Sequence, residues 1–171
     1  MRKSAFIFLS VFCLLCLASA CKYSDKYEQV NANNKFILSV PPWMSEEKGL
    51  KAGADFEYAN RFRNFYAIGE AISKKDTDRS AALLMNDNLN ILRKSMTKPQ
   101  VTDSVEVVAG NIKGIRVELY GKMTGEDVYF SEVVFEGSSY YYHLSIWTRS
   151  GNRKLHFKGD IDKIIASFRE V

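Results

Sequence analysis

The sequence predicts a single α+β domain in which an antiparallel sheet is sandwiched by helices. Runs of alternating apolar and polar residues, typical of half-buried strands, stand on both sides of one long amphipathic segment. Short turns that contain glycine separate the later runs, as in an antiparallel meander. A second amphipathic segment closes the chain, so the elements follow the order strands, helix, strands, helix, which is typical of a layered domain.

Three strands are expected before the long helix. In the first, Phe36, Leu38 and Val40 alternate with Ile37 and Ser39, which suggests that one face is mostly buried. Pro41 and Pro42 end the strand because neither can donate to a ladder. The second places aromatic side chains on one side and carboxylates on the other, and a turn at 60–64 leads to the third. The expected strands cover residues 36–40, 54–59 and 65–73.

The long helix is expected between Asp76 and Pro99. Asp76, Thr77 and Asp78 offer N-caps and place negative charge at the positive end of the helix dipole. Pro99 is expected to end the helix. The apolar residues recur at spacings of three and four and therefore form one stripe: Ala81, Leu84, Met85, Leu89, Leu92 and Met96.

The second half of the chain is expected to form a meander and a final helix. The cleanest alternation begins at Ile115, and turns at Gly125 and Gly137 lead into the following strands. The final helix has one apolar stripe that ends at Phe168, with Asp160 near its start. The expected strands cover residues 101–109, 115–123, 127–136 and 140–148.

Aromatic side chains are dense in the last expected strands and supply the strongest site-like signal. Alternation sends Tyr141, His143 and Trp147 to one face of their strand, and Trp43 follows Pro42 on a loop. These residues either form cross-strand pairs and cap the core, or line a groove for a sugar, a small apolar molecule or a protein partner. The sequence leaves both interpretations open.

The chain carries no catalytic or metal-binding motif. His143 and His156 are its two histidines, and their thirteen-residue spacing matches no zinc motif. There is no Gly-x-Ser-x-Gly elbow and no glycine-rich phosphate loop, and Glu46 and Glu47 fit a solvated loop. We therefore expect no enzyme, no cofactor and no metal.

Residues 1–20 resemble a bacterial export signal. Arg2 and Lys3 precede about 13 apolar residues, which span roughly 20 Å as a helix and are too short to cross a bilayer. Small residues at 18–20 then lead to Cys21, as in the lipobox of bacterial lipoproteins, where the cysteine receives diacylglycerol on its sulfur. The segment departs from the usual lipobox because Leu17 stands one place further out than the usual large apolar residue. Simple secretion and a retained N-terminal anchor are the alternatives.

Removing this segment changes the composition of the chain. The net charge falls from +4 to +2, with 22 Lys and Arg residues against 20 Asp and Glu, which is no nucleic-acid signature. Cys13 and Cys16 leave with the signal, and Cys21 is the predicted lipid attachment site, so the body has neither disulfides nor thiolate metal ligands. Residues 21–34 lack a sustained period and are expected to form a flexible tether to a domain at 35–171.

The body resembles the PsbP and Mog1-like fold. The resemblance rests on a strand that ends in a proline pair before Trp43, on the segment around Tyr58, on a helix after Asp78, and on a last helix that closes with Ser167 and Phe168. It implies an antiparallel sheet between helices and a binding or accessory role without shared enzymology.

Together these features predict a membrane-anchored lipoprotein of the cell envelope that acts as a non-enzymatic accessory or protein-binding module. The alternative is a lipoprotein that holds a glycan or a small apolar molecule on its aromatic face. Lys22 directly after the cysteine favours the periplasmic face of the outer membrane. The expected partners are the membrane, reached through the lipid, and an envelope protein. The sequence does not define the oligomeric state.

Overall fold

The computed structural model describes residues 26–149 and 153–171. The predicted signal at 1–20 and the predicted lipid attachment site Cys21 lie outside the described residues. The helices are α2 (Ala81–Lys94) and α3 (Arg153–Ala166). The strands are β1 (Glu28–Ala32), β2 (Phe36–Val40), β3 (Ser45–Glu46), β4 (Phe56–Asn60), β5 (Phe65–Ser73), β6 (Thr97–Val101), β7 (Val105–Ala109), β8 (Ile112–Met123), β9 (Glu126–Glu136), β10 (Tyr140–Arg149) and β11 (Arg169–Glu170).

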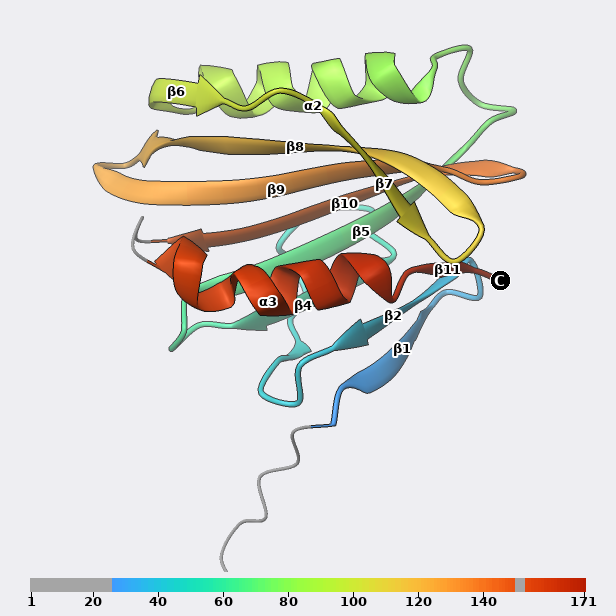
Figure 1. The fold of residues 1–171 in the computed structure, drawn as a ribbon, viewed down its shortest axis with the longest axis horizontal. Coiled ribbons are helices and arrows are strands. Elements are labelled where there is room, and N and C mark those ends of the chain that lie inside the picture. Colours follow the sequence, from blue (N-terminus) through green and yellow to red (C-terminus); the bar gives the residue numbers. More distant parts are fainter. Residues whose placement is uncertain (1–25, 150–152) are drawn as a thin grey trace, which may run out of the picture.

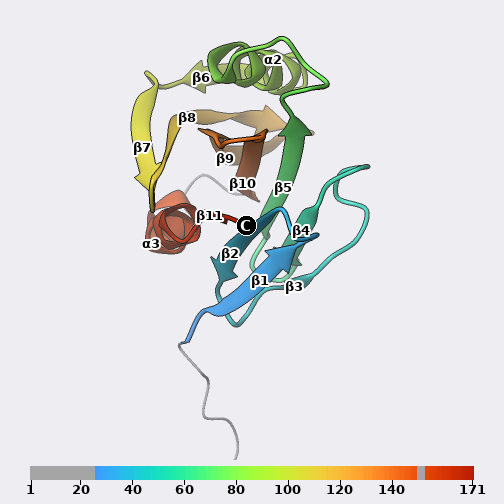
Figure 2. The same ribbon diagram turned by 90° about the vertical axis from the view of Figure 1, so that its right-hand side faces the viewer.

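The strands form two antiparallel sheets. The large sheet has the order β3-β4-β5-β10-β9-β8-β6, with β7 also paired to β8, and the small sheet has the order β1-β2-β11. Helix α2 lies over one face of the large sheet, above β8 and β9, and α3 and the small sheet lie over the other face (Figure 1, Figure 2). The predicted sandwich of an antiparallel sheet between helices is confirmed.

The main core lies between the large sheet, α3 and the small sheet. Phe168 is fully buried, and its ring stacks on Phe135 of β9 at 4.4 Å and on Phe36 of β2 at 5.7 Å. Ser167 accepts a hydrogen bond from the backbone N–H of Ser39 (2.8 Å). The closing Ser-Phe pair therefore fastens the end of α3 to β2, through a polar contact and a buried ring.

Helix α2 begins later than the sequence predicts. Ser80, rather than Asp76, Thr77 or Asp78, is the N-cap, and its hydroxyl accepts a hydrogen bond from the backbone N–H of Leu83 (3.3 Å). The helix also ends at Lys94, well before Pro99, which lies in β6. Local hydrogen bonds determine where the helix begins and ends. The sequence offers several polar residues that could make these bonds, and it does not show which of them do.

Two further predictions about elements are wrong in detail. Glu28–Ala32 is a strand paired with β2, although this segment was expected to belong to the flexible tether. It gains order because β2 supplies backbone partners for a segment that has little apolar pattern of its own. Residues 101–109, expected to form one strand, divide between β6 and β7 at 102–104.

Candidate interaction surface

Strand β7 forms an open edge of the large sheet. It pairs over its whole length with the first half of β8, whereas β6 pairs with the second half of the same strand. Among the residues that the structure describes, no strand pairs with the other side of β7, which lies at the border of the sheet in Figure 2. The backbone groups on that side therefore have no strand partner among these residues, which is the condition that strand addition requires.

Local sequence explains why the chain forms this edge. Thr102 makes the corner between β6 and β7: its backbone N–H donates to the Glu118 carbonyl (3.0 Å), and its hydroxyl accepts from the Glu118 N–H (3.1 Å). Three valines favour an extended backbone in β7. A two-residue turn then begins with Gly110 at a positive φ of 60° and returns the chain into β8.

Strand β7 exposes two valines, which strand alternation places on opposite faces of the sheet. Val105 is 53% exposed and Val108 is 58% exposed. The charged residue on the strand, Glu106, forms an ion pair with Lys113 (3.3 Å). Natural edge strands usually carry lysine, proline or a bulge that prevents pairing, and β6 has both Lys98 and Pro99. Strand β7 has none of these protections.

A hollow of about 310 Å³ lies beside this edge. Ile115 and Val134, which pair across β8 and β9, line it together with Ala81 at the start of α2. Lys113 and Glu136 are also among its lining residues. The combination of an open backbone edge and a neighbouring apolar hollow suits an extended peptide that carries an apolar side chain.

A polar trio is buried within the large sheet. Glu132 is 1% exposed, and one of its carboxylate oxygens lies 2.6 Å from Nε2 of His143, while the other accepts a hydrogen bond from the Ser145 hydroxyl (2.5 Å). Serine donates here to the acid rather than to the imidazole, so the arrangement lacks the contact between nucleophile and base that a catalytic triad requires. The trio satisfies buried polar groups.

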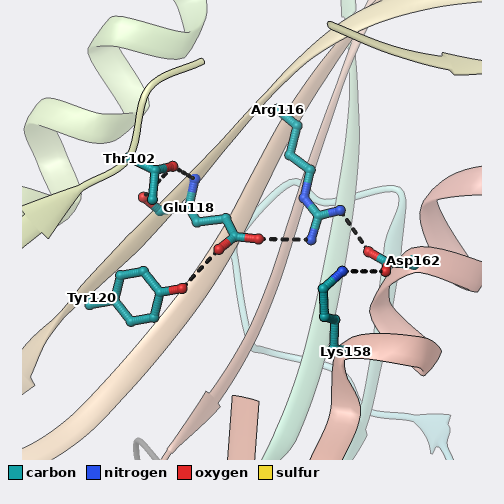
Figure 3. Close-up of polar contacts among 6 residues, drawn as sticks. All are labelled: Thr102, Arg116, Glu118, Tyr120, Lys158 and Asp162. Atoms are coloured by element: carbon teal, nitrogen blue, oxygen red, sulfur yellow. Dashed lines mark hydrogen bonds and ion pairs between the residues drawn. The ribbon is translucent and has the colours of Figure 1, made fainter. Parts of the chain in front are cut away.

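A second polar cluster joins β8 to α3 (Figure 3). Arg116, whose side chain is 11% exposed, binds Asp162 of α3 at 2.7 Å and Glu118 at 3.2 Å. Tyr120 donates to Glu118 (2.8 Å), and Lys158 donates to Asp162 (2.8 Å). The two cations of this cluster, Arg116 and Lys158, balance its two anions, Glu118 and Asp162. We call these four residues and Tyr120 the clamp. No group of metal-ligating side chains occurs within residues 26–149 and 153–171.

The clamp alters the pKa values of its member Asp162 and of the neighbouring Tyr129. Burial by itself would raise the pKa of Asp162, but hydrogen bonds from Lys158 and Arg116 outweigh it and lower that pKa below its usual value. Burial, together with the nearby Glu118 charge, raises the pKa of Tyr129 to about 12. Both shifts keep these side chains in their ordinary charge states at neutral pH.

The four aromatic-face residues do not share one surface. Tyr141 packs with the cluster beneath α2, and Trp147 is stacked between Tyr66 (5.2 Å) and Phe130 (5.7 Å) on the same side of the sheet. His143 lies between them and is 5% exposed, with its imidazole directed at Glu132.

Trp43 instead contacts Phe65 and Phe157 in the core beneath α3, on the opposite side of the sheet. A ligand or partner face that includes Tyr141 and Trp147 stays a prediction.

Sequence reasoning missed the β7 edge. The polar run Thr102-Asp103-Ser104 is a recognisable turn signal and predicts a break between two strands. Whether a strand lies at an edge depends on its pairing partners, which the local pattern does not specify.

No protein-family model matches the sequence, and no curated protein matches it significantly. The architecture is that of the PsbP and Mog1-like fold. A solved structure of PsbP from the cyanobacterium Synechocystis sp. PCC 6803 superposes with a TM-score of 0.62 at 13% identity, covering 91% of this chain and 99% of that one. The Ran-binding protein Mog1p of Saccharomyces cerevisiae gives 0.58 at 13% identity, covering 85% and 96%.

A third similar structure is LpqN of Mycobacterium tuberculosis, which is described as involved in cell envelope biogenesis. Its TM-score is 0.55 at 12% identity, with 87% of each chain covered. At these identities the likeness establishes the fold. In the described part of the chain, neither helix has the length and apolar character needed to span a membrane.

Proposed function

We propose that this protein is a lipid-anchored, non-enzymatic binding module of the cell envelope and that it holds a protein partner at the open edge of β7. The observation that carries the proposal is the unpaired, valine-rich edge beside an apolar hollow. The partner is expected to supply an extended segment with an apolar side chain that is directed into the hollow.

The similar structures support a binding role without defining it. Mog1p is described as Ran-binding, and LpqN as involved in cell envelope biogenesis. The buried Glu132 trio and the charge-balanced Arg116 clamp each have a structural explanation, so neither of them calls for a catalytic function. Attachment through Cys21, with the domain on the periplasmic face of the outer membrane, is the location that we propose.

Replacement of Cys21 tests the anchor. Cys21→Ala removes the sulfur that would carry the lipid, so the variant is expected to move from the membrane fraction to the soluble fraction and to lose incorporation of labelled palmitate. Cell fractionation and labelling measure both effects. Tight membrane association of the variant, together with unchanged labelling, would contradict the proposed attachment.

Charged substitutions test the β7 edge. Val105→Glu combined with Val108→Glu places two carboxylates on exposed positions, which leaves folding nearly intact but opposes strand addition. We expect a crosslinked complex formed by the wild-type protein in intact cells to decrease about tenfold or more in this variant.

The matched control changes exposed apolar residues on α2. Leu83 is 54% exposed and Ile91 is 67% exposed, so Leu83→Glu with Ile91→Glu adds the same charge to a different surface. This variant should retain the complex. If the α2 variant loses the complex and the β7 variant keeps it, the edge is not the binding surface.

A further inference from the structure

A second surface lies where the turn between β4 and β5 approaches the start of α3. Phe62, in the turn, is 97% exposed, and Leu155, in the first turn of α3, is 81% exposed. Both segments lie at the same end of the molecule in Figure 1. A hollow of about 480 Å³, lined by Phe62, Arg63, His156 and Phe157, connects them. Two strongly exposed apolar side chains on segments that border one hollow form a candidate contact surface.

The turn that carries the phenylalanine is held in place by its neighbours. The Asn60 side chain donates to the Trp43 carbonyl (2.6 Å) and accepts from the Arg63 N–H (2.9 Å). The Arg63 guanidinium lies 4.7 Å from the Trp43 ring, and Arg61 forms an ion pair with Glu47 (2.6 Å). The phenylalanine is therefore presented by an ordered turn rather than by a loose loop.

Basic residues accompany both exposed apolar side chains. Phe62 stands between two arginines in the sequence, and Arg153 and Lys154 directly precede Leu155. The first turn of α3 contains no acidic residue. Cations at the N-terminus of a helix oppose the helix dipole, so helix stability does not explain their presence. Apolar side chains that are flanked in the sequence by basic residues match the boundary between anionic headgroups and acyl chains.

The described part of the chain begins beside the middle of α3. The Tyr27 hydroxyl donates to Asp160 of α3, and Nζ of Lys163 lies 5.1 Å from the Tyr27 ring. Asp160 follows Leu155 by five positions, which is about 7.5 Å along a helix. Lys26 follows Cys21 by five positions, a separation that an extended chain spans in at most about 18 Å. A lipid on Cys21 would thus hold the start of α3 near the bilayer.

We propose that Phe62 and Leu155 insert into the surface of an anionic phospholipid membrane and fix the orientation of the domain on it. This inference rests on the proposed lipid anchor, which supplies the membrane proximity that two apolar side chains do not secure by themselves. The basic residues that flank both positions in the sequence are opposite in charge to the headgroups.

The test uses the lipidated protein on vesicles of phosphatidylethanolamine and phosphatidylglycerol. The body contains no cysteine, so Phe62→Cys, Leu155→Cys and the control Leu83→Cys each introduce a unique thiol for an environment-sensitive fluorophore. The labels at 62 and 155 are expected to report an apolar environment and to be quenched by nitroxide-labelled lipids. The label at 83, on the exposed side of α2, should remain in water.

Equal access of an aqueous quencher to all three labels on flotation-purified vesicles would overturn the membrane contact while leaving the anchor intact. Protection of position 62 in cells but not on vesicles would show that this surface binds a protein instead, and would also overturn the proposal. Failure of the wild-type protein to float with vesicles is a different result, since it contradicts the anchor.

A second arm keeps the surface testable without the anchor. Full-length Cys21→Ser protein is mixed with the same vesicles at high lipid concentration, and its partition coefficient is measured by sedimentation. Phe62→Asp with Leu155→Asp should lower that coefficient about tenfold relative to the Cys21→Ser parent, because both apolar contacts are lost. An unchanged coefficient would reject the proposed surface.

Discussion

Arg116 links α3 to β8 through buried charged contacts. Its guanidinium is nearly buried and contacts Asp162 on the helix and Glu118 on its own strand. Removal of the cation would leave two carboxylates close together in a poorly hydrated region. The sequence places these charges in a strand and a helix, but it gives no sign that they meet, because they are separated by 46 positions.

Arg116→Met should lower the free energy of unfolding by about 2–3 kcal/mol, since the apolar stem is kept and the charge is lost. The matched control is Lys113→Met on the same strand, whose ion pair with Glu106 is exposed and should contribute less than about 0.5 kcal/mol. Denaturant titration of both variants measures the difference. Equal losses would show that the Arg116 contacts do not act as a clamp.

The effect of Arg116→Met should also depend on pH. The clamp lowers the pKa of Asp162 in the folded state, so its contribution is fully present above the unfolded-state pKa and is lost as pH falls through the folded-state pKa. Denaturant titrations at about pH 7 and about pH 3 should therefore show a smaller gap between wild type and variant under acidic conditions. A gap that widens on acidification would contradict this assignment.

Close packing between the two sheets depends on the small sheet lying directly on β5. A Cβ atom added at Gly69 would lie 2.8 Å from the Phe36 ring of β2 and 3.0 Å from a methyl group of Leu144. Gly159 in α3 provides a contrast, because an added Cβ there has no neighbour within 4 Å. The absence of a side chain at Gly69 thus allows β2 to pack closely on β5, whereas α3 has room for a side chain at Gly159.

Gly69→Ala should lower the free energy of unfolding by about 1–3 kcal/mol through overpacking. Gly159→Ala should raise it by about 0.5–1 kcal/mol, because alanine favours the helix that glycine weakens. Thermal or denaturant unfolding of the two variants compares them directly. A neutral Gly69→Ala would mean that the small sheet can move away from β5 at little cost.

Elements with a strong periodic pattern were predictable from the sequence, and those defined by pairing were not. The expected strand at 65–73 coincides with β5 because its alternation is long and a turn precedes it. The strand Glu28–Ala32 was missed because its order comes from contact with β2. The break between β6 and β7 was missed although the polar residues at 102–104 signal a turn.

At the scale of the whole molecule, the proposed contacts occupy different parts of the domain. The described chain begins beside α3. The β4–β5 turn and the start of α3 lie at one end, while the free edge of β7 borders the large sheet (Figure 1, Figure 2). The density of aromatic residues in the sequence was enough to select four candidate residues, namely Tyr141, His143, Trp147 and Trp43. Their distribution over two sides of the sheet follows from strand register and from the loop after Pro42, which local patterns do not reveal.

The most direct test of the binding role is photo-crosslinking in cells from the edge of β7. A photoreactive residue at Val108 in the full-length, anchored protein should form a covalent adduct with an extended segment of one partner protein, identified by mass spectrometry. The same residue at Leu83 is the control and should give no such adduct. An adduct from position 83 or 147, with none from position 108, would contradict the assignment of β7 as the partner-binding edge.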